Sequence, residues 1–86
     1  MYTSIITVPN ETGLHARPAS QLAELCQTFD SELRIYSEED EIDPKSIISI
    51  LSGGIGKGSI IKLTAEGSDA QEAGKAITAF IESLTE

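Results

Sequence analysis

The sequence has 86 residues, with 14 Asp and Glu against six Lys and Arg, so its formal net charge is −8. That length predicts one domain, residues 1–86, with a single thin core between two packed layers. No apolar run approaches the roughly 18 residues of a membrane span, and an acidic chain without a basic stripe is disfavoured as a nucleic-acid binder. The first residues lack the pattern of a signal peptide, which predicts a cytoplasmic protein.

The first helix of the chain carries the most informative prediction. Ile6 and Val8 share one face of a strand over residues 3–8, and apolar residues then recur at helical spacing over residues 16–28. Pro18 is tolerated only in the first turn of a helix, so this helix must begin close to His15 or Ala16. The only histidine of the chain is therefore predicted at a helix N-terminus.

Five further elements follow by the same reasoning. They are a strand over 32–36, an acidic turn at 37–40 leading to a short strand near 41–42, a helix over 47–51, a strand over 60–66, and a helix after residue 69. Asp69 is the expected N-cap of the last helix, and Glu72 completes a pattern like a capping box. The order βαββαβα predicts an antiparallel or mixed sheet with helices on one face.

The helix over 47–51 has more apolar residues than one buried face can hold. Ile47, Ile50 and Leu51 share an arc of about 100°, while Ile48 lies about 60° beyond Leu51. Either the helix is wholly buried, or Ile48 and with it Leu51 form an exposed apolar patch. In so small a domain the patch is favoured, and such patches are typical of binding surfaces.

Two other features predict no chemistry of their own. The glycine-rich stretch 53–58 is interpreted as a flexible connection, because Lys57 is followed by Gly58 and a strand rather than by the Ser or Thr and helix of a phosphate-binding loop. Cys26 lies on the apolar face of the first helix and is expected to be buried. One His and one Cys are too few for an ordinary metal centre, so no metal or cofactor is predicted.

His15 and Arg17 together favour the binding of a phosphoryl group. The N–H groups at a helix N-terminus attract anions, and a guanidinium matches the geometry of phosphate oxygens. A neutral imidazole can attack an electrophile held there. Acid–base hydrolysis would require a second titratable group, and none can be paired with His15 from the sequence.

Three stretches of this chain resemble HPr, the histidine-containing phosphocarrier of the sugar phosphotransferase system: residues 13–19, residues 45–47, and residues 65–67 before an acidic helix start. The resemblance covers about residues 3–84. It implies an α+β fold, the open-faced β-sandwich, in which four antiparallel strands carry three helices on one face.

The resemblance also implies a function. His15 would accept a phosphoryl group on Nδ1 from phospho-enzyme I and donate it to a histidine of an enzyme IIA component. Arg17 would stabilise the transferring group, together with the amides of Ala16 and Arg17. Such a protein is a carrier and not an enzyme, it is expected to be a monomer, and it needs no cofactor. The partner-binding surface would comprise Thr12, Ala16, Ser20, Lys45, Ile47, Ile48 and Leu51.

Ser46 has two interpretations. It matches the position at which an ATP-dependent HPr kinase phosphorylates some family members, whose phosphoserine form binds a catabolite-control transcription factor. At the start of a helix it is equally a simple N-cap, and the two roles are compatible.

The chain departs from the family pattern in its charges. The family often has bases at the positions of Glu24, Gln27 and Ser49. It often has Met at the positions of Ile48 and Leu51, which stay apolar here, and Leu at the position of Gly53. We therefore expect apolar docking with weak electrostatic steering. The alternatives are a regulatory module acting through Ser46 and the patch, a carrier of the nitrogen-related branch, or an adaptor or small-molecule-binding domain. Regulatory relatives of this type lack the histidine.

Overall fold

A computed structural model describes residues 1–38 and 40–85. Each predicted element is present, with boundaries within a residue or two of expectation. In chain order the elements are β1 (Tyr2–Thr7), α1 (Ala16–Gln27), β2 (Glu32–Ser37), β3 (Asp40–Ile42), α2 (Ile47–Ser52), β4 (Ile60–Glu66) and α3 (Ala70–Glu82). Glu39, in the predicted acidic turn, lies outside the described residues.

The four strands form one sheet in the order β1-β4-β2-β3, and every pairing is antiparallel. The alternation of side chains along β4 determines its two faces, because successive residues of a strand point to opposite sides. Ile61, Leu63 and Ala65 are buried against the helices, while Ile60 and Lys62 point outward. The α+β open-faced architecture is therefore confirmed, and the mixed-sheet alternative is wrong.

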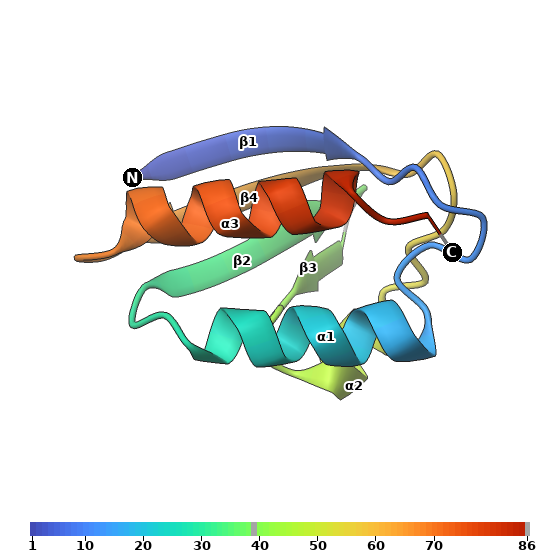
Figure 1. Cartoon of the computed structure of the whole chain (residues 1–86), viewed down its shortest axis with the longest axis horizontal. Coiled ribbons are helices and arrows are strands. Elements are labelled where there is room, and N and C mark those ends of the chain that lie inside the picture. The colour runs from blue at the N-terminus through green and yellow to red at the C-terminus, as the bar shows by residue number, and fades with distance from the viewer. Residues whose placement is uncertain (39, 86) are drawn as a thin grey trace.

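The helices lie on the buried face of the sheet, with α1 and α3 side by side across it and α2 beside α1 (Figure 1). The apolar stripe of α1 includes Leu22, Ala23 and Cys26, all fully buried. Burial raises the pKa of the Cys26 thiol to about 12. This confirms the prediction that Cys26 fills the core. Among the described residues, no helix has the length and apolar character to cross a membrane.

The prediction that Asp69 caps α3 through its side chain is wrong. Asp69 occupies the N-cap position, but its carboxylate makes no hydrogen bond to the helix that follows. Instead it accepts hydrogen bonds from the backbone N–H groups of Asp30 at 2.8 Å and Ser31 at 2.9 Å, and from the Ser31 hydroxyl. The fold brings the turn before β2 against the start of α3, and three donors there replace the amide that a capping box would use.

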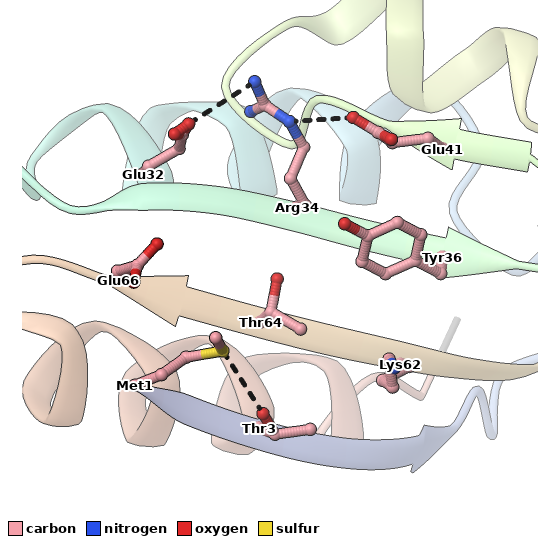
Figure 2. Close-up of a pocket in the computed structure, with 9 residues that line it drawn as sticks. All are labelled: Met1, Thr3, Glu32, Arg34, Tyr36, Glu41, Lys62, Thr64 and Glu66. Atoms are coloured by element: carbon pink, nitrogen blue, oxygen red, sulfur yellow. Dashed lines mark hydrogen bonds and ion pairs between the residues drawn. The ribbon is translucent and has the colours of Figure 1, made fainter.

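The open face of the sheet carries a depression of about 530 Å³ (Figure 2). Both of its basic side chains have local partners. Arg34 Nε lies 3.1 Å from Glu41 Oε2, and the Lys62 ammonium lies 5.5 Å from the centre of the Tyr36 ring. None of the predicted site residues lines this depression.

Candidate functional site

His15 is the N-cap of α1, as the position of Pro18 predicts. Its backbone is extended, with φ −90° and ψ −168°, and its carbonyl oxygen accepts the first helical hydrogen bond from Ala19 N at 2.8 Å. The imidazole makes no capping hydrogen bond, and the residue is exposed. The ring therefore stands at the positive end of α1 with access to a partner protein.

The first turn of α1 presents backbone donors beside this ring. The first N–H groups of an α-helix have no carbonyl one turn before them to bind, and the first turn of α1 begins at Ala16. Pro18 has no N–H and is buried, which anchors the turn. Ala16 and Arg17 are both exposed. An anion placed beside the imidazole would thus meet the positive end of the helix.

The loop before His15 is held by the glycine-rich stretch that follows α2. Leu14 is buried, and its N–H donates to the carbonyl of Ile55 at 3.0 Å. Ile55 is itself only 4% exposed and belongs to the core. The interpretation of residues 53–58 as a mere connection therefore missed a structural role. The one signal in the sequence was an isolated Ile among glycines.

The α2 helix exposes its apolar side chains. Ile47, Ile48 and Leu51 are 40%, 75% and 44% exposed, while Ile50 is fully buried. The predicted patch is confirmed as an exposed surface, and Ile47 belongs to it although its arc placed it beside the buried Ile50. We call Ile47, Ile48 and Leu51 the α2 patch.

Ser46 is the N-cap of α2, and its Oγ accepts a hydrogen bond from Ser49 N at 3.2 Å. The capping interpretation of Ser46 is therefore confirmed. The Ser46 residue is half-buried and lies directly before the α2 patch. A phosphate added there would change the charge beside exposed apolar side chains.

Two sets of contacts place α2 along α1. At one end, Lys45 Nζ donates to the Phe29 carbonyl at 2.9 Å, and Gln27 Nε2 donates to the Lys45 carbonyl at 2.9 Å. At the other end, Ile55 meets Leu14 beside the histidine. Lys45 and Ser46 thus lie by the C-terminal end of α1, and the chain runs from there through the α2 patch toward the loop that carries His15.

The remaining predicted residues lie around His15. Thr12 is exposed in the preceding loop, and Ser20 is half-buried on α1. Lys57, the other base near this loop, is paired with Glu11 through a 2.8 Å contact between its Nζ and Oε1. The Lys45 ammonium binds a backbone carbonyl. Both lysines thus make contacts within the chain.

Residues 2–83 match the family model described as the PTS HPr component phosphorylation site. The chain is 43% identical over 77 residues to the HPr-like protein Crh of Halalkalibacterium halodurans, covering 90% of this chain and 92% of that protein. The structure of HPr-C-His from Thermoanaerobacter tengcongensis superposes with a TM-score of 0.93 and 40% identity, over 96% of this chain and 93% of the other.

A phosphocarrier protein HPr from Bacillus anthracis str. Ames superposes with a TM-score of 0.89 and 36% identity, over 93% of this chain and 95% of the other. The family model matches nearly the whole chain, and these relatives share its fold from end to end. The chain therefore belongs to the HPr family of the phosphotransferase system, whose members are phosphocarriers rather than catalysts.

Proposed function

We propose that this chain carries phosphoryl groups in sugar uptake, accepting them on His15 from phospho-enzyme I and donating them to enzyme IIA components. The observation that supports this most is an exposed histidine at the N-cap of α1, the end of the helix at which backbone N–H groups attract anions. Membership of the HPr family supports the same role.

In the proposed transfer, the lone pair of His15 Nδ1 forms a bond to phosphorus while the bond from phosphorus to the enzyme I imidazole breaks. The electron pair of the broken bond stays on the enzyme I nitrogen. One P–N bond replaces another, so the step is reversible and needs no co-reactant. The amides of Ala16 and Arg17 and the Arg17 guanidinium would bind the phosphoryl oxygens, where charge is spread in the transition state.

The proposed docking surface extends from Thr12, Ala16 and Ser20 to the α2 patch. The apolar side chains of the α2 patch would exclude water from the interface, as in other protein complexes. Lys45 lies at its margin, and its side-chain ammonium already donates to Phe29. We therefore expect Lys45 to contribute less to binding than the α2 patch does.

Labelled phosphoenolpyruvate and enzyme I test the proposal directly. The wild-type chain should take up one acid-labile phosphate, His15→Ala should take up none, and Arg17→Ala should react about a hundredfold more slowly, the usual loss when one charge-stabilising donor is removed. Ser46→Ala serves as the matched control and should react at the wild-type rate. If the wild-type chain gains no acid-labile phosphate, the proposal is wrong.

A second candidate is a regulatory module that acts through Ser46 and the α2 patch. The position of Ser46 directly before Ile47 and Ile48 favours it, as does similarity to an HPr-like protein Crh. The presence of His15 favours the carrier. An arm with ATP and an HPr kinase separates the two, because a phosphate on Ser46 is acid-stable. Only acid-stable phosphate on the wild type would support the regulatory candidate alone.

We further propose a cytoplasmic monomer that meets its partners in turn through this one surface. A dimer of HPr from Thermoanaerobacter tengcongensis has been solved, so sedimentation at several concentrations is the test of the monomer. Transfer from the phosphorylated chain to sugar-branch or nitrogen-branch enzyme IIA proteins distinguishes the two pathways.

A further inference from the structure

Asn10 is a buried polar residue in the loop between β1 and His15. Asn10 is only 3% exposed, although a Pro-Asn pair such as Pro9-Asn10 is typical of a turn at the surface. Burial of a side-chain amide costs free energy unless hydrogen bonds replace those to water. The contacts of Asn10 therefore indicate why an amide is retained there.

Those contacts converge on Gly13. Asn10 Nδ2 donates to the Gly13 carbonyl oxygen at 2.9 Å, and the Asn10 carbonyl accepts from Gly13 N at 3.2 Å. Asn10 Nδ2 also lies 3.4 Å from Thr12 Oγ1. A single residue thus binds both backbone polar groups of Gly13, whose φ of +62° turns the chain toward the histidine.

The peptide group between Gly13 and Leu14 is held at both ends. Its oxygen accepts a hydrogen bond from Asn10 Nδ2. Its N–H, which belongs to Leu14, donates to the Ile55 carbonyl at 3.0 Å. A peptide group is planar, so two opposed hydrogen bonds restrict rotation of the whole plane. The next residue is His15, whose direction depends on that plane.

The side-chain oxygen of Asn10, Oδ1, is the reason to expect that loss of this residue affects local geometry more than global stability. Oδ1 is buried and accepts no hydrogen bond from the described part of the chain. Replacement by Ala removes one unpaired acceptor and leaves another, the Gly13 carbonyl, without this donor. Because these two effects oppose each other, the change in global stability should be small. The loss should fall on the local geometry instead.

We propose that Asn10 is a positioning residue that orients His15 and the first turn of α1 through the Gly13–Leu14 peptide group. This inference rests on the proposed phosphotransfer for its functional consequence, but its structural part can be tested without that function.

The test measures amide hydrogen exchange and phosphotransfer for wild type and Asn10→Ala, with Glu11→Gln as the matched control. Glu11→Gln lies in the same loop and alters only the exposed pair with Lys57. In Asn10→Ala, exchange at Leu14 N should rise at least about tenfold, because the Gly13–Leu14 peptide group is then held only by its bond to Ile55, while exchange in β4 stays within about threefold. Glu11→Gln should match the wild type at both places.

For the reaction with phospho-enzyme I, kcat of Asn10→Ala should fall about tenfold with KM within about threefold, because orientation and not docking is lost. Unchanged exchange at Leu14, or an equal rise across all amides, would overturn the proposal, and so would an unchanged kcat. If Asn10→Ala does not fold, Asn10→Ser is measured in the same way. A wild-type chain that takes no phosphate refutes the proposed function, while exchange at Leu14 still decides whether Asn10 holds the loop.

Discussion

Gly13 shows how a single residue can determine the path of the chain into the site. Its φ of +62° is unfavourable for other residues, and a Cβ there would overlap the Ile55 carbonyl oxygen. Gly54 has nearly the same φ, +63°, but a Cβ at Gly54 would meet nothing within 4 Å. The two glycines thus share a backbone conformation and differ in their surroundings.

We expect Gly13→Ala to lower the free energy of unfolding by about 3 kcal/mol, the sum of left-handed strain and displacement of the Ile55 backbone. Gly54→Ala should lower the free energy of unfolding by only about 1 kcal/mol, because left-handed strain is the only effect at that position. Urea unfolding of both variants measures the difference. Equal losses would show that the Gly13–Ile55 approach contributes nothing to stability.

Asp69 links the start of α3 to the turn before β2. Hydrogen bonds from the Ser31 side chain, and then from the Asp30 backbone, hold the pKa of its carboxyl below the ordinary 3.8. A carboxylate with a lowered pKa contributes stability that is fully present above its unfolded value. That contribution is lost as pH falls through the folded pKa, which lies below 3.8.

The difference in stability between wild type and Asp69→Asn should therefore depend on pH. The variant should be less stable than wild type at neutral pH, and the difference should shrink as pH falls below about 4. Urea midpoints measured at several pH values from neutral to about 2 provide the comparison, with the exposed Glu82→Gln as control. A wild-type to Asp69→Asn difference that is the same at every pH would contradict this role.

At the scale of elements, α3 packs on β1 through a glycine in its middle. A Cβ at Gly74 would overlap the ring of Tyr2, so the helix accepts a residue of low helix propensity in order to approach the strand closely. Gly→Ala in a helix normally stabilises by about 1 kcal/mol. Overpacking normally destabilises by about 1–3 kcal/mol, which makes the steric effect the larger one here.

Gly74→Ala should therefore destabilise the wild type by about 1 kcal/mol, the difference between these effects. With the ring removed by Tyr2→Ala, the same substitution should stabilise the chain by up to about 1 kcal/mol. Thermal or urea unfolding of the four proteins of this cycle gives both values. A loss of stability in the Tyr2→Ala background would exclude the ring as the cause.

At the scale of the whole molecule, the net charge of −8 coexists with a proposed docking surface that is poor in basic groups. Lys57 is paired with Glu11, and Lys45 binds a backbone carbonyl. Electrostatic attraction raises association rates mainly at low salt, because raising ionic strength from about 0.01 M to about 1 M shortens the screening length from about 30 Å to about 3 Å.

The association rate with enzyme I should accordingly change by less than about tenfold over that range of salt. Glu24→Lys, which restores a base at an exposed position of α1, should make the dependence steeper. Stopped-flow measurements across an ionic-strength series check both. A steep decline for the wild-type chain would mean that its few bases are sufficient for steering.

The sequence by itself determined the elements and the position of His15 at the start of α1. Apolar periodicity is local, so it predicted all seven elements, and Pro18 predicted a histidine at a helix start because its ring is compatible only with the first turn. The excess of apolar residues in α2 likewise predicted an exposed patch.

Only the tertiary structure decided which distant groups meet. The Asp69 carboxylate binds the turn at Asp30 and Ser31 instead of its own helix, and Ile55 closes over Leu14. The exposure of Ile47 is also a tertiary outcome. Such contacts depend on how strands and helices pack across long sequence separations, and neither periodicity nor a capping pattern carries that information, because both describe only neighbours along the chain.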